Sequence, residues 1–215
     1  MKLKVCGMKY QDNMNQVALL HPDYLGFIFY DGSSRFFDGV MPQLSKKISK
    51  VGVFVNASLQ NIIEKIRKYD LQAVQLHGEE SPVFCEKLKK QCADQSKEVV
   101  KIIKVFSIKE EFNFDILRPY EAVCDYFLFD TKGKLPGGNG YTFDWKVLRD
   151  YPSTTPYFLS GGIGLNEMAD VKSFLQKKES KYCHAIDINS RFEIEPGMKN
   201  IEELKEFKRQ LRQFE

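Results

Sequence analysis

Short apolar runs recur along the whole chain and alternate with longer segments in which apolar residues follow a helical period. The runs are rich in β-branched and aromatic residues and show only weak apolar–polar alternation, which is typical of parallel strands covered on both faces. They are Leu3–Val5, Tyr24–Phe29, Val51–Val55, Ala73–Leu76, Val99–Phe106, Tyr126–Phe129, Tyr157–Leu159 and Ala185–Ile188. The pattern therefore predicts eight strands.

The segments between these runs predict helices with identifiable first residues. Ser81 and Pro82 have the residue types favoured at the N-cap and at the first helical position, and Asn200 with Glu203 resembles a capping box. The clearest helical face follows a predicted N-cap at Ser58 and consists of Leu59, Ile62, Ile63, Ile66 and Tyr69. Such faces are expected to pack on the sheet.

Eight strands that alternate with helices predict an α/β protein with a single (β/α)8 TIM barrel, because closing the parallel sheet leaves no exposed edge. One domain over residues 1–215 is expected, since no linker or low-complexity segment divides the chain. A doubly wound open sheet is the alternative. It is disfavoured because no Gly-x-Gly-x-x-Gly follows the first strand, although such a sheet does not require that motif.

The composition limits the classes of molecule that the protein is expected to bind. The net charge of +3 arises from 32 basic and 29 acidic residues that are interspersed, so nucleic acid is not an expected partner. No apolar run approaches the roughly 20 residues of a membrane span, and the first residues lack a signal peptide's apolar core, so we expect a cytoplasmic protein without membrane association. Five cysteines without close pairs argue against a disulfide framework and a structural zinc site.

Barrel enzymes place their chemistry at the carboxyl ends of the strands. Cys6 ends the first strand and is followed by Gly7, which permits a sharp turn. A lone cysteine is more often a small buried hydrophobic residue, but its thiolate is a good base where positive charge lowers the pKa. Asp130 follows three large apolar residues, where desolvation favours the protonated form; otherwise it is an N-cap or an ion-pair partner.

Several further strand ends suit ligand binding. Gly161 and Gly162 follow the seventh strand, and Asn189 and Ser190 follow the eighth, where such barrels commonly hold a phosphate. Asp187 ends the eighth strand. These positions predict a phosphate site, and a glycine pair alone would be weak evidence for it.

Two loops carry other candidates. The glycine-rich segment 131–140, which includes Gly137 and Gly138, suits a loop that closes over a ligand, or simply a flexible turn. Arg35 lies in a long loop, where it is either a fork for a carboxylate or a solvated surface arginine. For His77 we expect a structural hydrogen-bonding role. The remaining histidines show no metal-ligand spacing, so no metal site is predicted.

Taken in order, seven segments resemble the signature of the phosphoribosylanthranilate isomerase family and extend over nearly the whole chain. They are Lys4–Gly7, Gly52–Asn56, Val74–Glu79, Phe129–Thr131, Gly137–Gly140 with Phe143–Trp145, Ser160–Ile163 and Asp187–Ser190. The resemblance implies an Amadori rearrangement in tryptophan biosynthesis. N-(5-phosphoribosyl)anthranilate is converted into 1-(2-carboxyphenylamino)-1-deoxyribulose 5-phosphate without metal or cofactor.

The resemblance also implies roles. Asp130 matches the general acid, which protonates the ribose ring oxygen, and Cys6 matches the base, which removes the C2 proton. Arg35 matches the residue that holds the anthranilate end, and Asp187 an electrostatic or positioning residue, while Gly137 and Gly138 fall in the substrate-covering loop. The phosphate positions are Gly161, Gly162, Asn189 and Ser190. The partner is a small phosphosugar, and the chain is expected as a monomer or homodimer.

This chain departs from the family pattern at two positions. Arg191 stands where glycine is usual, beside the expected phosphate site, and Asn139 stands where threonine is common. Another phosphosugar barrel, indoleglycerol phosphate synthase, is a weaker alternative because it needs a lysine as catalytic acid. A phosphate-ligand binding protein without catalysis is the other alternative, since fold alone does not prove function.

Overall fold

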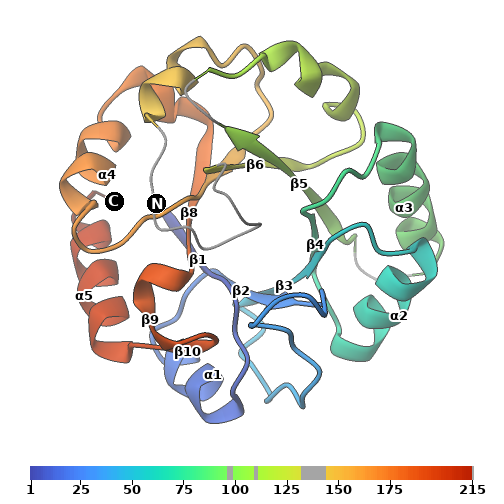
Figure 1. The fold of residues 1–215 in the computed structure, drawn as a ribbon, viewed down its shortest axis with the longest axis horizontal. Helices are drawn as coiled ribbons and strands as arrows, with labels where there is room; N and C mark the ends of the chain where they lie inside the picture. The colour runs from blue at the N-terminus through green and yellow to red at the C-terminus, as the bar shows by residue number, and fades with distance from the viewer. Residues whose placement is uncertain (96–98, 109–110, 132–143, 215) are drawn as a thin grey trace.

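The computed structural model describes residues 1–95, 99–108, 111–131 and 144–214, and its main element is a closed barrel of eight parallel strands. Each strand pairs with the next along the chain, and β8 pairs with β1, so the predicted barrel is confirmed (Figure 1). The strands are β1 Lys2–Val5, β2 Tyr24–Ile28, β3 Ser49–Phe54, β4 Ala73–Leu76, β5 Lys101–Ile108, β6 Tyr126–Thr131, β7 Tyr157–Leu159 and β8 Cys183–Ile188. The fifth strand begins two residues after the predicted Val99, whose side chain is exposed.

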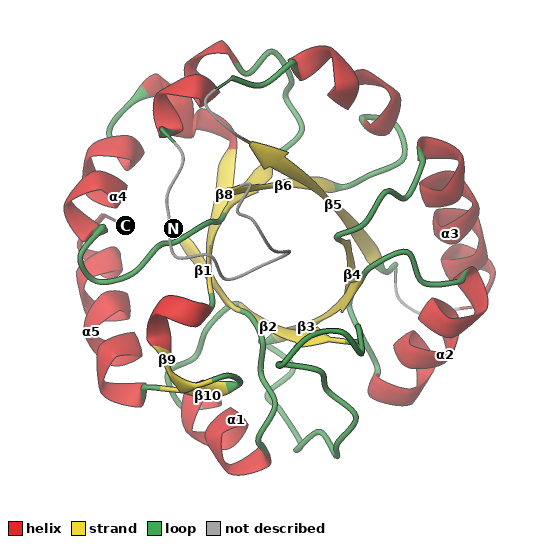
Figure 2. Ribbon diagram, in the orientation of Figure 1, coloured by secondary structure: helices red, strands yellow, loops and turns green. Residues whose placement is uncertain are grey.

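Helices surround the ring of strands (Figure 2). The α-helices are α1 Gln11–Ala18, α2 Leu59–Tyr69, α3 Pro82–Gln95, α4 Met168–Leu175 and α5 Ile201–Leu211, and the 3-10 helices are η1 Phe114–Tyr120, η2 Trp145–Asp150, η3 Lys178–Tyr182, η4 Ser190–Phe192 and η5 Arg212–Phe214. The predicted caps are present: the side chain of Ser58 accepts from Asn61 N, and that of Asn200 from Glu203 N. In the described part of the chain, no helix has the length and apolar character needed to cross a membrane.

The regular alternation of strand and helix fails between β2 and β3. Residues 29–48, all of them described, contain no helix, and the only helices that follow β5 and β6 in the described residues are of the 3-10 type. Glycine, proline and serine are frequent in residues 31–45 and disfavour an α-helix there. The buried ring of Phe37 covers β2 instead, with its centroid 5.2 Å from that of Phe27 and 5.4 Å from that of Tyr69. This anchor holds the loop that carries Arg35 at the rim of the barrel.

An antiparallel pair of short strands, β9 Glu193–Glu195 and β10 Met198–Lys199, follows η4 outside the ring. Figure 1 shows this hairpin beside α1. Asn13 of α1 joins the two, because its side chain donates to Lys199 O at 2.9 Å and accepts from Lys199 N at 2.8 Å. The hairpin is therefore fixed against the barrel at the end where β1 and β8 finish.

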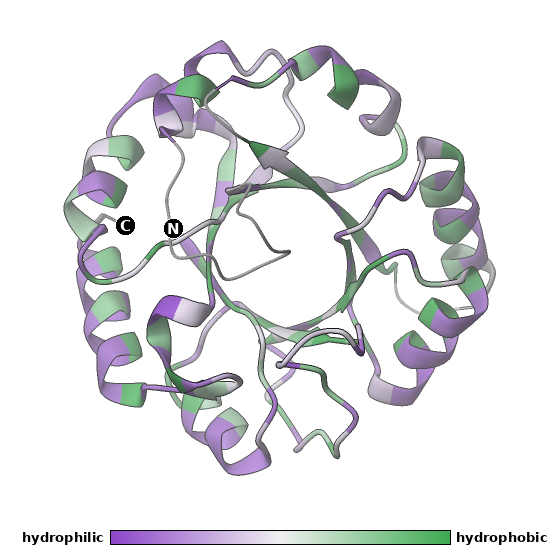
Figure 3. Cartoon of the chain, viewed as in Figure 1, coloured by the Kyte–Doolittle hydropathy of each residue, from purple (hydrophilic) through white to green (hydrophobic). Residues whose placement is uncertain are grey.

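The interior of the barrel is an apolar plug that gives way to polar side chains toward the carboxyl ends of the strands. The plug comprises Tyr24, Val51, Ala73, Ile103, Val105, Leu128, Phe158 and Ala185. Alternate residues of a strand share a face, so Gln75, Asp130 and Asp187 continue the inward face beyond Ala73, Leu128 and Ala185. The strands themselves are mainly hydrophobic (Figure 3). The plug thus forms the floor on which a polar site stands.

We expect Phe158→Ala to destabilise the protein by about 3–5 kcal/mol, because it removes a fully buried ring from the plug and leaves a cavity. The ring packs edge-to-face on Tyr24 and Tyr126 with centroid separations of 5.2 and 5.4 Å. Urea unfolding monitored by circular dichroism measures the change. Leu19→Ala, at a residue with 75% of its surface exposed, is the control, and an equal loss in both variants would contradict the assignment of the plug.

Candidate functional site

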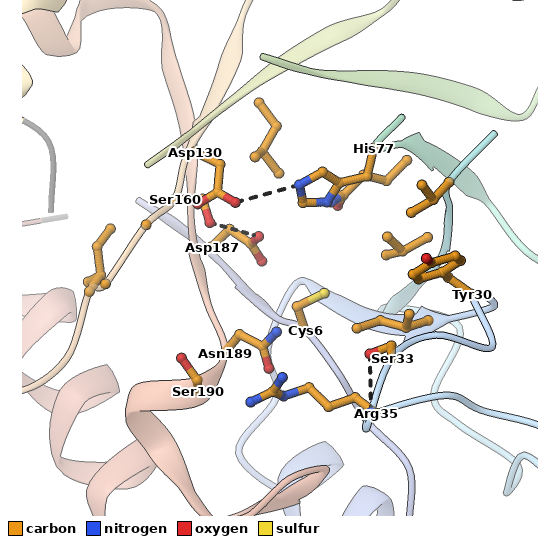
Figure 4. Close-up of a pocket in the computed structure, with 18 of the residues that line it drawn as sticks. Cys6, Tyr30, Ser33, Arg35, His77, Asp130, Ser160, Asp187, Asn189 and Ser190 are labelled. Atoms are coloured by element: carbon orange, nitrogen blue, oxygen red, sulfur yellow. Dashed lines mark hydrogen bonds and ion pairs between the residues drawn. The ribbon is translucent and has the colours of Figure 1, made fainter. Parts of the chain in front are cut away.

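A cavity opens at the carboxyl ends of the strands. Eight of the ten residues predicted for the site line it, namely Cys6, Arg35, Asp130, Gly161, Gly162, Asp187, Asn189 and Ser190. The other two, Gly137 and Gly138, lie outside the described residues. Figure 4 shows Asp130 and Asp187 on one side of Cys6 and Asn189 and Arg35 on the other. Positions far apart in the sequence are thus brought to one place by the barrel.

Cys6 is held at the end of β1 by glycines on both sides of it. Its N–H donates to Ile188 O at 2.8 Å, which ties it to β8. A Cβ at Gly26 would lie 2.7 Å from the sulfur of Cys6, so only glycine leaves room for the thiol. Gly7 has φ +74°, in the left-handed region that glycine adopts without strain. The local sequence therefore serves to place one thiol at the cavity.

Beneath Cys6 lies a buried ion pair that sequence analysis did not identify. Lys4 Nζ donates to Asp187 Oδ1 at 2.8 Å, and the side chains are 0% and 6% exposed. The two residues are directly paired across β1 and β8. Side chains two residues apart in an extended chain point to the same face, so Lys4 and Cys6 share a face. This two-residue repeat could have identified Lys4 as a neighbour of the site.

The thiol of Cys6 is protonated in the resting site. Burial raises its pKa above the ordinary value and outweighs the charge of Lys4, which acts in the opposite direction, while the charge of Asp187 adds to the increase. The sequence-based hypothesis of a thiolate stabilised by positive charge is therefore only partly supported. A cation is present, but it does not bring the pKa below that of a free thiol.

The carboxyl group of Asp130 is desolvated as well, and its pKa is also raised. Its side chain is 14% exposed, and burial, followed by the charge of Asp187, raises its pKa from 3.8 to about 6. Its Oδ1 accepts from Thr131 N at 2.9 Å, which fixes the carboxyl group at the end of β6. The raised pKa agrees with the desolvation expected from the sequence.

His77 also lines the cavity, where a purely structural role was expected. Its Nε2 lies 3.6 Å from Asp130 Oδ2, and Gln75 Nε2 lies 3.4 Å from its Nδ1. Burial, with the charges of Lys104 and Lys4, lowers its pKa to about 4, so the ring is neutral near pH 7. A neutral imidazole can be a hydrogen-bonding partner of Asp130, but it carries no charge and so is not its counter-ion.

The turn after β7 and the segment after β8 form a further wall of the cavity. Gly161 has φ +96° and Gly162 φ +66°, and a Cβ on Gly161 would lie 2.2 Å from Thr131 Oγ1. These glycines allow the backbone to pass close to β6 and line the cavity together with Asn189 and Ser190. Arg191, the departure from the family pattern, lines it too, so this wall combines backbone groups with a cation.

Arg35 lies beside Asn189 in the cavity lining, and its guanidinium contacts a carboxylate of the protein itself. Nε is 2.9 Å from both oxygens of Glu193, and Nη2 is 2.7 Å from Oε2. Glu193 in turn accepts from Lys199 Nζ at 2.7 Å. Sequence analysis missed Glu193 and Lys199, because the sequence of a short polar segment does not show which of its charged side chains are buried.

No three His, Cys, Asp or Glu side chains in the described ranges are grouped so that they could hold a metal ion. What the arrangement offers chemically is proton transfer. One cavity presents a carboxyl group whose pKa is raised to about 6 and a thiol, and it is also lined by an arginine and by a pair of glycines.

Comparison with known proteins points to one family. A family model described as N-(5'phosphoribosyl)anthranilate (PRA) isomerase matches residues 3–210. A relative from Parabacteroides distasonis, an N-(5'-phosphoribosyl)anthranilate isomerase, is 42% identical over 219 residues, which cover 98% of this chain and 93% of the relative.

Solved structures agree with this result. A phosphoribosyl anthranilate isomerase from Thermus thermophilus has a TM-score of 0.82 at 23% identity, over 100% of both chains, which supports the fold. A phosphoribosyl anthranilate isomerase in complex with reduced 1-(o-carboxyphenylamino)-1-deoxyribulose 5-phosphate has a TM-score of 0.74 at 25% identity, over 99% of both chains.

The raised pKa of Asp130 should cost stability near neutral pH. Its folded state binds the proton more tightly than the unfolded chain, so unfolding becomes easier as pH rises from 3.8 to about 6. That difference corresponds to about 3 kcal/mol. We therefore expect Asp130→Asn, which mimics the protonated form, to be more stable relative to wild type at about pH 7 than at about pH 4 by up to that amount.

Urea unfolding of both proteins at the two pH values measures this difference. Asp38→Asn changes an exposed aspartate outside the cavity and should alter stability by less than about 0.5 kcal/mol at either pH. A stability difference for Asp130→Asn that is the same at both pH values would contradict the raised pKa.

Proposed function

The chain belongs to the N-(5'-phosphoribosyl)anthranilate isomerase family, and from this premise we propose that Asp130 and Cys6 are the acid and base of its reaction. The chain catalyses the isomerisation of N-(5-phosphoribosyl)anthranilate to 1-(2-carboxyphenylamino)-1-deoxyribulose 5-phosphate in tryptophan biosynthesis. The observation that carries the proposal is that a desolvated carboxyl group and a buried thiol share one cavity, with Asp187 between them in Figure 4.

The first proton transfer is assigned to Asp130. Protonated Asp130 donates to the ribose ring oxygen, the bond between that oxygen and C1 breaks, and the nitrogen lone pair forms a Schiff base. A pKa of about 6 leaves a usable fraction of the carboxyl group protonated near neutral pH and makes its anion a weak base once the proton has left. The negative charge of Asp187 favours the cationic Schiff base that results.

The second proton transfer is assigned to Cys6. Its thiolate takes the proton from C2, the electron pair forms the C1–C2 double bond of an enolamine, and the nitrogen becomes neutral. Tautomerisation of the enol then yields the ketone. Because burial raises the pKa of Cys6, its thiolate is a stronger base than a free cysteine, and the cationic Schiff base compensates for its formation.

The remaining residues are proposed to hold the two ends of the substrate. Gly161, Gly162, Asn189 and Ser190 lie on one wall, where backbone N–H groups and short polar side chains suit a phosphate dianion. Arg35 is proposed for the carboxylate of the anthranilate ring.

Roles are also proposed for the remaining predicted site residues. Asp187, which lines the same cavity, is proposed as an electrostatic or positioning residue near the substrate. From the sequence, Gly137 and Gly138 stay assigned to the loop that covers the substrate.

We also propose a cytoplasmic location and a monomeric or homodimeric state. All five cysteines are free thiols, which fits a reducing compartment. Sedimentation velocity at several protein concentrations distinguishes the two assembly states.

The roles of the acid and base predict that Asp130→Asn and Cys6→Ser each lower kcat by at least about 100-fold while ligand binding changes little, because general acid–base catalysis contributes about that much. A fluorescence assay follows the loss of freshly generated substrate without added metal, and calorimetry with the reduced product analogue measures binding. Asp38→Asn is the control for activity. Turnover close to wild type in either variant would remove that residue from the mechanism, and an inert wild type would favour a binding protein.

The pKa values also predict the pH profile. Activity needs Asp130 protonated and Cys6 ionised, although Asp130 loses its proton first, so the active form is a minor one. kcat/KM should therefore rise with pH up to about 6, stay level, and fall only where Cys6 ionises. Because Asp187 raises the pKa of Asp130, Asp187→Asn should move the lower limb to lower pH. A lower limb that does not move in this variant, with Asp38→Asn as reference, would contradict the coupling.

A further inference from the structure

A buried charged cluster lies behind the arginine end of the cavity and has no step in the proton transfers. It consists of Arg35 from the loop after β2 with Glu193 and Lys199 from the β9–β10 hairpin, and their side chains are 16%, 5% and 0% exposed. The three charges sum to +1, and Arg35 is the most exposed member. A cluster with one net positive charge that reaches solvent through a guanidinium suits a single carboxylate.

Glu193 is fully engaged within the protein. Its Oε1 accepts from Arg35 Nε at 2.9 Å, from Lys199 Nζ at 2.7 Å and from Gly197 N at 3.1 Å, while Oε2 accepts from Arg35 Nη2 at 2.7 Å. Burial alone would raise the pKa of Glu193, but the hydrogen bond from Arg35 and the charge of Lys199 hold it below the ordinary value. Glu193 therefore acts as a permanent anion whose partners are inside the fold.

This contact decides which part of Arg35 is left for a ligand. A guanidinium offers two edges that can bind a carboxylate in bidentate fashion, one with Nε and Nη2 and one with Nη1 and Nη2. Glu193 occupies the first edge. Arg35 lines the cavity, so the second edge remains as its bidentate donor there. The side chain is thereby prevented from rotating freely.

Lys199 fixes the orientation of the Asn189 side chain in a similar way. Its Nζ donates to Asn189 Oδ1 at 2.7 Å, which assigns the oxygen of this amide and leaves Nδ2 as donor on the other side. A Cβ at Gly7 would lie 2.5 Å from Asn189 Oδ1 and 2.8 Å from Arg35 Cδ, so both side chains pass directly over that glycine. Only a glycine after Cys6 permits this packing.

We propose that Glu193 and Lys199 are positioning residues that fix the free edge of Arg35 and the amide of Asn189, and so determine selectivity for a substrate that carries a carboxylate. This inference rests on the proposed role of Arg35. It adds that the hairpin, through two residues that contact no substrate, sets how strongly the enzyme distinguishes the anthranilate ring from a ring without the carboxylate. Preorganisation of this kind reduces the entropy lost when the ligand binds.

The test compares two ligands. The first is reduced 1-(o-carboxyphenylamino)-1-deoxyribulose 5-phosphate, and the second is the same compound made from aniline, which lacks the carboxylate. The ratio of their dissociation constants, measured by calorimetry, is the carboxylate preference. A general loss of packing weakens both ligands alike and leaves this ratio unchanged, so the ratio reports positioning of Arg35.

We expect Glu193→Gln to raise the Kd of the carboxylated ligand about tenfold and that of the other less than about twofold. Arg35→Met should abolish the carboxylate preference. Adding Glu193→Gln to Arg35→Met should cause no further loss of affinity for the carboxylated ligand, because Glu193 acts through Arg35. Glu206→Gln is the matched control, since Glu206 forms the same bidentate contact with Arg209 on the exposed face of α5. It should leave both constants unchanged.

Two outcomes separate this inference from the function on which it rests. If Arg35→Met keeps the preference, the proposed role of Arg35 fails and the inference fails with it. If Arg35→Met loses the preference but Glu193→Gln keeps it, only the inference is overturned. Should Glu193→Gln fail to fold because Lys199 loses its ion pair, Glu193→Gln/Lys199→Met removes both charges and permits the same comparison.

Discussion

The ion pair between Lys4 and Asp187 is the constraint on which the site depends. Two unit charges with side chains 0% and 6% exposed are tolerated inside a barrel only because they lie 2.8 Å apart, since an isolated buried charge would be neutralised or would unfold the region. The parallel register of β1 and β8 places them directly opposite each other. The closed barrel therefore does more than support the site, because it places a carboxylate and its lysine partner together where water is largely excluded.

That carboxylate acts in the same direction on the two groups proposed for proton transfer. The charge of Asp187 raises the pKa of Asp130 and of Cys6, which increases the protonated fraction of the proposed acid and makes the proposed base stronger once it is ionised. Neither effect favours stability, because each makes a buried ionised group more costly. The site is thus a place where the sequence accepts destabilising electrostatics, and the apolar plug below it supplies compensating burial.

The sequence allowed the fold and most of the cavity lining to be predicted, since both follow from local patterns. Apolar runs mark strands, and in a barrel the residues after each run meet at one rim, so Cys6, Asp130 and Asn189 were located without knowledge of contacts. The long loop that carries Arg35 was predicted, but its anchor on β2 through Phe37, in place of a helix before β3, depends on long-range packing. Lys4 and Lys199 were missed because hydropathy assigns lysine to the surface, whereas both are buried against a carboxylate, Asp187 in β8 for Lys4 and Glu193 in the hairpin for Lys199.

The two buried lysines have the same relation to the cavity. Lys4 pairs with Asp187 behind the acid and base, and Lys199 pairs with Glu193 behind Arg35 and Asn189. Lys4 and Asp187 are 183 residues apart, so this pair forms only when β8 closes the barrel on β1. Lys199 and Glu193 lie in one hairpin, and that hairpin is fixed to the barrel through Asn13 of α1. Completion of the fold and completion of the site are therefore one event, because the charges that organise the cavity can be buried only when β8 and the hairpin have docked on β1 and α1.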